Sequence, residues 1–195
     1  MTGVQTCALP ILGIIDGAGL RLQEATDALN GFGEIYLKQT LASGVIPQIT
    51  AVLGTCGGGS AILTSLSDFT FMSRKDSKLF VNSPNAIEGN YTAKCDTATA
   101  DFQAKAGTVD FVYESDEAVL AKIRELITIL PSNNEDDASY DECNDDLNRL
   151  LPNFTAKTGD TALALQDISD DNYFYEVKAE RSEERRVGKE CPRCV

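Results

Sequence analysis

Residues 45–60, with the sequence VIPQITAVLGTCGGGS, decide the fold of this protein. Residues 45–53 are almost continuously apolar and rich in β-branched side chains, a pattern typical of a strand covered on both faces in a parallel sheet. A glycine-rich run follows, and residues 61–66 then predict a helix. A buried strand, a glycine turn and a helix in this order favour an α/β protein.

The same order of elements occurs once before this stretch. Residues 12–15, LGII, predict a short buried strand that ends at the turn formed by residues 16–19, DGAG. A helix is expected over residues 24–43 because apolar residues recur there at helical spacing. The residues expected on its inner face are Leu29, Phe32 and Tyr36. The chain therefore alternates strands with helices, as expected when parallel strands are joined by crossover helices.

Later elements follow the same pattern. Residues 69–72 and 78–81 predict two short strands, and a helix is expected to begin at Ser115 and to stop at Pro131. The apolar stripe of this helix consists of Val119, Leu120, Ile123, Leu126, Ile127 and Leu130. Beyond it, an exposed acidic linker is expected over residues 132–146, then a weak helical pattern over residues 163–168 and a strand over residues 173–177.

The composition excludes several classes of protein. A chain of 195 residues, 43% of them hydrophobic, can bury one sizeable core and begin a second domain. No apolar run approaches about 20 residues and no secretory signal is evident, so we expect a cytoplasmic protein without membrane insertion. The net charge of −13 argues against nucleic-acid and membrane-surface partners. The absence of histidine excludes Ser-His-Asp, Cys-His and HExxH chemistry.

The two ends of the chain are expected to be foreign to the fold. Residues 2–11, TGVQTCALPI, resemble the translation of a common sequencing adapter, and residues 181–191, RSEERRVGKEC, resemble the matching adapter from the opposite end. We therefore set residues 1–11 and 181–195 aside as adapter-like artefacts. The pair Cys191 and Cys194 has the spacing of zinc ligands, but a second ligand pair is missing from the sequence, so no metal is expected.

Two glycine turns carry the chemistry that the sequence suggests. The turns at residues 17–19 and 57–59 each follow a predicted strand and each lead into a predicted helix. Main-chain N–H groups at such turns can hold an anion or a developing oxyanion, and turns from neighbouring strands can converge. A thioester carbonyl held there would become an enolate stabilised by backbone donors, each worth roughly 3 kcal/mol. The alternative is that the glycines only permit tight turns or close packing.

Other candidate groups have structural alternatives as well. Cys56 lies at a predicted helix start, where its pKa could fall, although packing is the stronger hypothesis without a histidine partner. Arg21 could bind a carboxylate or a phosphate, or form an ordinary surface ion pair. Three carboxylates could serve as acid–base groups of a hydratase, or be solvated or capping side chains. They are Asp16, Glu24 and Glu34.

Five blocks in order resemble the amino-terminal domain of biotin-dependent acyl-CoA carboxyltransferases, such as the β subunits of propionyl-CoA and acetyl-CoA carboxylases and the related decarboxylases of anaerobes. The blocks are residues 16–24 (DGAGLRLQE), 30–36 (NGFGEIY), 42–49 (ASGVIPQI), 54–59 (GTCGGG) and 67–72 (SDFTFM). The resemblance implies a crotonase-like (ClpP/crotonase) spiral of ββα units, incomplete here. It also implies an acyl-CoA-binding domain over residues 12–144, and a linker with the start of a truncated second domain over residues 145–180.

The resemblance also implies a reaction and its residues. The family moves a carboxyl group between the biotin nitrogen and the α-carbon of an acyl-CoA. The backbone N–H groups of Gly58 and Gly59 match the pair that stabilises the enolate, and the turn at Gly19 and Leu20 matches the loop lining the CoA site. Arg21 belongs to a matching block, and Gly57 precedes the glycine pair. Ala18 and Leu20 depart from the usual glycine and small residue, and both departures concern the acyl pocket.

The resemblance further implies the partners of the protein. Biotin would be carried on a separate carrier protein or domain, with a biotin carboxylase subunit as a further partner and no metal in this chain. The full-length subunit would form a homo-oligomer with its active site between subunits, so a lone fragment should be inactive. Two alternatives stay open: an enoyl-CoA hydratase or isomerase of the same fold, and a non-catalytic fragment that binds CoA or a partner subunit.

Overall fold

The computed structural model describes residues 9–83, 96–136, 145–146, 148–152, 154 and 159–181. The chain divides into two compact units. Unit 1 comprises Met1–Ser139 together with Lys178–Val195, and unit 2 comprises Tyr140–Val177. The functional candidates named above all lie in unit 1.

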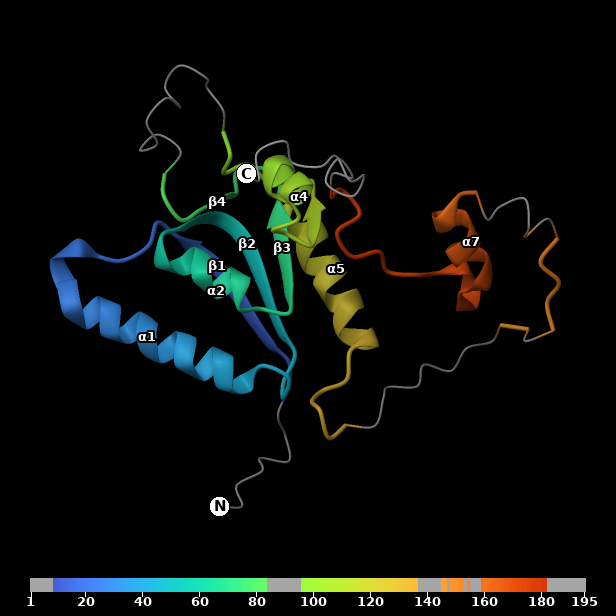
Figure 1. Ribbon diagram of the computed structural model, residues 1–195, viewed down its shortest axis with the longest axis horizontal. Helices are drawn as coiled ribbons and strands as arrows, with labels where there is room; N and C mark the ends of the chain where they lie inside the picture. The colour runs from blue at the N-terminus through green and yellow to red at the C-terminus, as the bar shows by residue number, and fades with distance from the viewer. Residues whose placement is uncertain are drawn as a thin grey trace, which may run out of the picture. The chain divides into compact units, whose positions relative to one another are not determined.

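Unit 1 is built on a parallel sheet of five strands (Figure 1). The strands are β1 (Ile11–Gly17), β2 (Gln48–Gly57), β3 (Phe69–Ser73), β4 (Lys78–Phe80) and β5 (Phe111–Tyr113). Their order is β1-β2-β3-β5, and β2 is long enough to pair with β3 along its first half and with β4 along its last three residues. Because β2 also pairs with β1, it is the central strand of the sheet.

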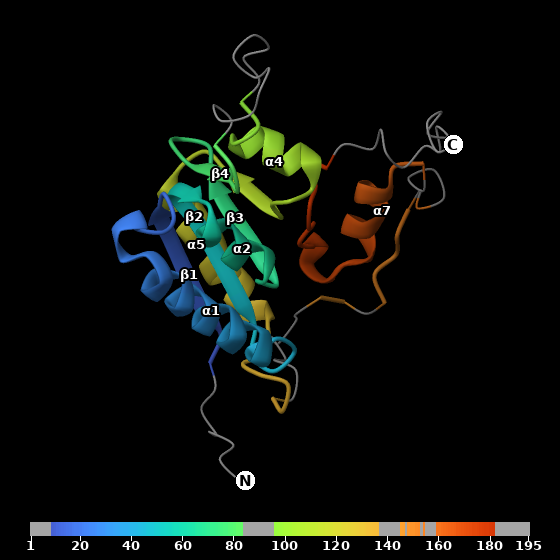
Figure 2. The ribbon, with the colours of Figure 1, turned by 60° about the vertical axis from the view of Figure 1, so that its left-hand side comes forward.

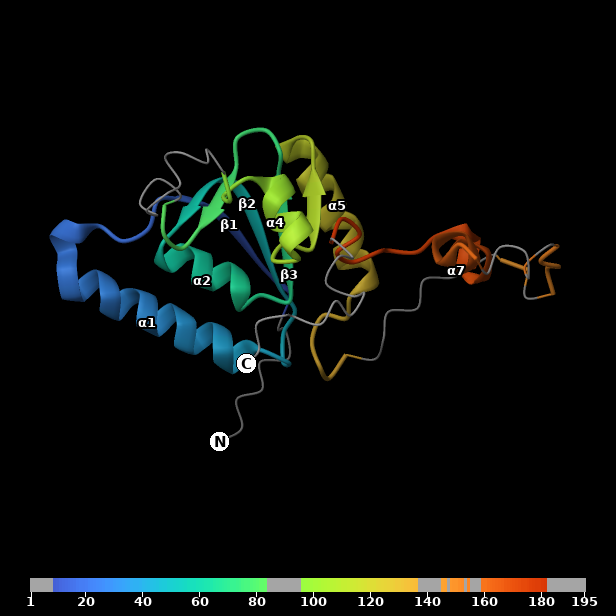
Figure 3. The same ribbon diagram turned by 45° about the horizontal axis from the view of Figure 1, so that its top comes forward.

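Helices cover both faces of the sheet. The helical segments of unit 1 are η1 (Leu22–Glu24), α1 (Ala25–Ala42), α2 (Gly59–Ser65), α4 (Ala100–Ala106) and α5 (Asp116–Ile129). Unit 2 contains α7 (Thr161–Ile168) and η3 (Asp170–Asn172). Figures 2 and 3 show α1 and α2 on one face of the sheet and α5 on the other. The predicted α/β class is therefore confirmed. None of the helices in the described ranges is long and apolar enough to cross a membrane.

The hydrophobic core lies along β2 and β3. Val52, Phe71 and Met72 are completely buried, and the ring of Phe71 stacks on that of Phe111 with 4.6 Å between centroids. The first five residues of β2 are buried on both faces, as the apolar run predicted. The strand begins later than predicted, at Gln48. It also ends later, because its last residues pair with β4.

Helix α5 forms where its sequence signals predicted it. The Ser115 hydroxyl accepts a hydrogen bond from the N–H of Ala118 at 3.2 Å, which caps the first turn. Val119, Ile123 and Leu126 form the buried face against the sheet. Three of the six residues of the predicted apolar stripe are therefore buried, and they cover one side of the core.

Two predictions about buried surfaces are wrong. Strand β1 was expected to be buried, yet Ile14 is 58% exposed because β1 is the edge strand of this sheet and has a neighbour on one side only. Leu29 was expected on the inner face of α1, yet it is 59% exposed. The other two predicted inner-face residues of α1, Phe32 and Tyr36, do pack against the start of α2.

The secondary structure also differs from the prediction in two places. The strand expected over residues 173–177 is absent, since this described segment has no neighbouring strand to pair with. Sequence analysis did not predict α4 or β5. Helix α4 is fixed by its caps: the Thr99 hydroxyl accepts from the N–H of Phe102, and Gly107 ends the helix at φ 75°.

The linker and the domain boundary are only partly described. Residues 137–144 of the predicted linker lie outside the described residues. Within the described part, the N–H of Asn134 donates to the Val45 carbonyl at 2.9 Å, so the start of the predicted linker belongs to unit 1. The proposed boundaries at residues 11/12, 144/145 and 180/181 stay predictions.

Candidate functional site: two glycine turns at the carboxyl ends of β1 and β2

The two glycine turns meet in space. Gly17 in β1 pairs with Cys56 in β2, so both strands deliver their turns to the same edge of the sheet. Gly19 has a φ of 113°, and a Cβ atom placed on it would lie 3.0 Å from the carbonyl oxygen of Gly57. The convergence predicted from the sequence is therefore present, and it requires glycine at position 19.

Close packing also requires glycine at two positions of the second turn. A Cβ on Gly57 would lie 2.8 Å from the Phe80 ring, and one on Gly59 would lie 2.9 Å from the Tyr36 hydroxyl and 3.2 Å from the Phe32 ring. The alternative that the glycines permit close packing is therefore supported at both positions. It is compatible with a functional one, because the same contacts fix where the backbone of the turn lies.

The structure corrects one element of the predicted donor pair. The N–H of Gly58 already donates to the carbonyl of Phe80 at 3.0 Å and is not free for a ligand. The cause is β4: Gly57 pairs with Phe80, and the bond from Gly58 extends this parallel ladder by one residue. Gly58 also has a φ of 60°, a conformation that favours glycine.

The N–H of Gly59 lies differently. Gly59 is the first residue of α2, so its N–H has no carbonyl one turn earlier in the helix. The Gly58 carbonyl accepts from the N–H of Ala61 at 3.1 Å, along the helix. Since the C=O and N–H of a trans peptide point in opposite directions, the N–H of Gly59 points out of the start of the helix.

Cys56 is a packing residue. Its side chain is completely buried in the cluster around Val52 and Met72, and burial raises the pKa of its thiol from 9.0 to about 11. A thiol with a raised pKa is a poor nucleophile at neutral pH. The packing hypothesis is confirmed, and the proximity of a helix start does not lower this pKa.

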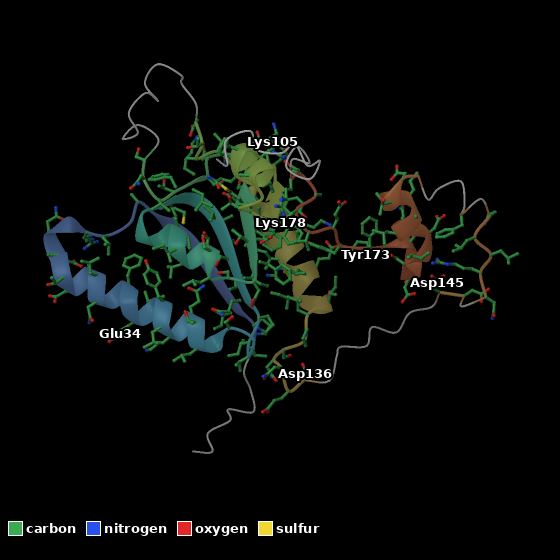
Figure 4. All side chains as sticks on the ribbon, in the orientation of Figure 1. Glu34, Lys105, Asp136, Asp145, Tyr173 and Lys178 are labelled. Atoms are coloured by element: carbon green, nitrogen blue, oxygen red, sulfur yellow. The ribbon has the colours of Figure 1, made fainter. Side chains whose placement is uncertain are left out.

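The charged candidates do not gather at one point. Arg21 is 80% exposed on its side chain and pairs with Glu24 at 3.5 Å, which is the ordinary surface ion pair considered above. Asp16 accepts a hydrogen bond from the N–H of Thr55 at 2.9 Å and so ties β1 to β2. Glu34 is exposed on α1 (Figure 4). The geometry therefore offers main-chain groups, and no constellation of acid–base carboxylates.

Sequence reasoning missed two residues that shape this site. Phe80 contributes both the ring against Gly57 and the carbonyl that holds Gly58. Tyr36 was predicted only as an apolar inner-face residue, yet its hydroxyl donates to the Gly59 carbonyl at 2.8 Å. A tyrosine on a packed helix face usually places its hydroxyl on a polar partner, which is the signal that could have indicated this bond.

A cavity of about 390 Å³ lies at the other end of the sheet. It is lined by residues before β2, at the start of β3 and after α5, among them Pro47, Phe69 and Pro131. Both glycine turns lie at the carboxyl ends of β1 and β2, so this cavity is not part of the candidate site. Within the described ranges, no group of three or more histidine, cysteine, aspartate or glutamate side chains is placed to hold a metal ion.

The chain matches a known family over almost its whole length. The model of the carboxyl transferase domain matches residues 2–188, and the chain therefore belongs to the carboxyl transferase family. It is 38% identical over 154 residues to the methylmalonyl-CoA decarboxylase subunit alpha of Propionigenium modestum, covering 75% of this chain and 29% of that protein. It is 34% identical over 193 residues to the propionyl-CoA carboxylase carboxyltransferase subunit of Haloferax mediterranei, covering 92% and 37%.

Solved structures support the same fold. A crystal structure of transcarboxylase 12S, described with methylmalonyl-coenzyme A and methylmalonic acid bound, matches with a TM-score of 0.77 at 29% identity over 89% of this chain and 36% of that one. The β subunit of geranyl-CoA carboxylase from P. aeruginosa matches with a TM-score of 0.55 at 25% identity, over 63% of this chain and 24% of that one. The predicted crotonase-like class is confirmed. The chain spans about a third of the length of the relatives it matches.

Proposed function

We propose that this chain binds the acyl-CoA in a carboxyl transfer between carboxybiotin and the α-carbon of the acyl group. Family membership supports this hypothesis over the hydratase and the non-catalytic alternatives. The structural observation that carries it is the contact between the Gly19 turn and the Gly57–Gly59 turn at one edge of the sheet. This arrangement offers backbone donors to a thioester oxygen without any histidine, which the sequence lacks.

The proposed role of the chain is to stabilise an enolate. When the α-carbon of the acyl-CoA loses its proton, negative charge develops on the thioester oxygen, and fixed N–H groups stabilise it. Carboxybiotin would supply the carboxyl group, which leaves the biotin nitrogen and bonds to the α-carbon while that nitrogen takes the proton. The protein then needs to provide position and donors, and no side-chain base.

Gly59 is the second-turn donor in this proposal. Because the N–H of Gly58 is bonded to the Phe80 carbonyl, Gly58 shapes the turn and does not donate to a ligand. The N–H of Gly59, in contrast, points out of the start of α2. We assign the other N–H donor of the pair to the main chain of the Gly19–Leu20 turn, which contacts Gly57. We also assign Arg21, which follows this turn and is exposed, to a phosphate of CoA.

The proposal extends to partners and location. Biotin would arrive on a separate carrier that a biotin carboxylase loads, and the full-length subunit would work as an oligomer in the cytoplasm. The transcarboxylase 12S structure is described as a hexamer assembly with substrate bound to a multienzyme core, which supports an oligomer for this protein as well.

The test is the biotin-dependent decarboxylation of malonyl-CoA by the intact subunit that carries this sequence. Gly59→Ala introduces a Cβ that must push against Tyr36 and Phe32, and so displaces the donor. We expect kcat/KM to fall by a factor of roughly 100 or more, the effect of losing one oxyanion donor. Gly33→Ala is the matched control: a Cβ there has no neighbour within 4 Å, and the change should leave activity intact.

Two results would contradict the proposal. Equal activity of the Gly59→Ala and Gly33→Ala proteins would remove Gly59 from the mechanism. If the intact subunit hydrates crotonyl-CoA, and if Glu34→Gln abolishes this hydration, the result would instead support the hydratase alternative.

A further inference from the structure

We propose that the Tyr36 hydroxyl is a positioning group that holds the Gly59 main chain in the orientation needed for donation. This inference rests on the function proposed above and adds a residue from α1 to it. The hydroxyl donates to the Gly59 carbonyl at 2.8 Å, across 23 residues of sequence.

Three consecutive peptide groups of the turn are each held by a different element. The peptide between Gly57 and Gly58 is held by β4, through the bond from the Gly58 N–H to the Phe80 carbonyl. The next peptide is held within α2, where the Gly58 carbonyl accepts from Ala61. The third peptide has its carbonyl on Gly59, and Tyr36 holds it from α1. Gly59 therefore has a fixed peptide on each side.

Tyr36 matters because glycine is the residue with the greatest conformational freedom. Gly59 is the first residue of α2 and has no side chain, so contacts from outside the helix add to the intrahelical bonds that restrain its φ and ψ. The aromatic pair on α1 provides them: the rings of Phe32 and Tyr36 lie 5.9 Å apart, and both come within 3.2 Å of the position that a Cβ on Gly59 would take.

Helix α1 is in turn fixed on α2 at a second point, so the hydroxyl is held in place. The Gln39 side-chain amide donates to the Leu63 carbonyl at 2.9 Å and to the Ser67 hydroxyl at 3.1 Å. The Gln48 amide also donates to the main-chain carbonyl of Gln39 at 2.9 Å. Tyr36 and Gln39 thus tie α1 to both ends of α2, and Gln48 ties α1 to the start of β2.

The experiment compares Tyr36→Phe with Thr40→Val. The first variant removes the hydroxyl and keeps the ring against Phe32. The second removes an exposed hydroxyl of the same helix, one that donates to the Tyr36 carbonyl at 2.8 Å within α1 and does not reach α2. Both variants should fold, which thermal unfolding of the 195-residue chain can verify.

The first measurement is amide hydrogen exchange, in the ligand-free chain, at Gly58 and Ala61, whose hydrogen-bonded N–H groups lie on either side of Gly59. We expect exchange to accelerate about tenfold in Tyr36→Phe, the effect of one hydrogen bond, and to stay unchanged in Thr40→Val. Equal exchange in all three proteins would overturn the inference. This arm does not depend on any enzymatic activity.

The second measurement is steady-state kinetics of the intact subunit with malonyl-CoA and free biotin. We expect Tyr36→Phe to lower kcat about tenfold with the KM for malonyl-CoA within twofold, because the donor is misaligned while the rest of the CoA contacts remain. A raised KM with unchanged kcat would overturn the positioning role. An inactive wild-type subunit, with faster exchange still seen in Tyr36→Phe, would contradict the proposed function and leave the positioning of Gly59 supported.

Discussion

At the scale of single residues, burial makes Cys56 a source of pH-dependent stability. Its thiol titrates near pH 9.0 in the unfolded chain and near 11 in the folded one. Between these values the unfolded state has lost the proton and the folded state has kept it, so the free energy of unfolding falls as the pH rises, by about 1 kcal/mol per pH unit. Urea unfolding at pH 8, 9.5 and 11 should show this slope, and Cys56→Ala should show a smaller one. The same slope in both proteins would contradict this role of Cys56.

A second prediction at this scale concerns the contact of Gly54 with Asp16. A Cβ on Gly54 would collide with the Asp16 carboxylate, which accepts the N–H of Thr55 at 2.9 Å. Gly54→Ala should therefore cost about 1–3 kcal/mol in the free energy of unfolding. In an Asp16→Ala background the carboxylate is removed and only the Cβ of residue 16 stays close, at 3.0 Å, so the same change should cost less. A double-mutant cycle by urea unfolding measures the difference, and additive effects would contradict the argument.

At the scale of elements, two aspartates hold the parallel strands in register by the same pair of bonds. Asp68, just before β3, accepts from the N–H of Gln48 at 2.8 Å and donates its own N–H to the Gln48 carbonyl. Asp110, just before β5, does the same with Thr70 at 2.7 Å and 3.0 Å. Each aspartate thus joins the start of its strand to the neighbouring strand.

The two aspartates should therefore be costly to remove. Asp68→Ala or Asp110→Ala leaves a strand N–H without its acceptor, and we expect a loss of about 1–3 kcal/mol in the free energy of unfolding. Asp76→Ala, at an exposed turn position, is the control and should change stability by less than about 0.5 kcal/mol. Chemical denaturation of the three variants is the measurement. If Asp76→Ala lowers the free energy of unfolding as much as the other two variants, the loss of a negative charge, and not the loss of strand register, explains the effect.

The elements also show how far the sequence predicts this fold. The periodicity and capping signals predicted α5, and the apolar run predicted β2. Both predictions depend only on residues within the element itself. The convergence of the two glycine turns was predictable from strand order. The bond from Gly58 to Phe80 was not, since its acceptor comes from a strand 22 residues later whose pairing partner the sequence does not indicate. The exposure of β1 likewise depends on its place at the sheet edge.

At the scale of the whole molecule, the chain returns to unit 1 after unit 2. Residues 178–181, the return segment, are held by two charged groups. The Lys178 ammonium donates to the Gly107 carbonyl at 2.6 Å and lies 3.3 Å from the Asp110 carboxylate (Figure 4). Arg74 pairs with Glu180 at 2.5 Å and also with Asp101 and Glu114. The hydrogen bond from the Arg74 guanidinium lowers the pKa of Asp101.

Loss of Arg74 should release the return segment. We expect Arg74→Gln to be cleaved by trypsin after Lys178 several times faster than the wild type, because Glu180 loses its partner. High salt should have the same effect on the wild type, since exposed ion pairs are screened. Arg124→Gln, at an exposed position on α5, is the control. Equal cleavage rates in Arg74→Gln and the control would show that Lys178 alone holds the segment.

The ion pair between Arg74 and Glu180 also has a consequence for synthesis. The two residues are 106 positions apart, whereas Asp101 and Glu114 follow Arg74 within 27 and 40 positions. On the ribosome, these two carboxylates therefore become available to Arg74 before Glu180 does. Glu180 is the last of the three carboxylates to be synthesised, so its bond to Arg74 can form only after the other two partners are present.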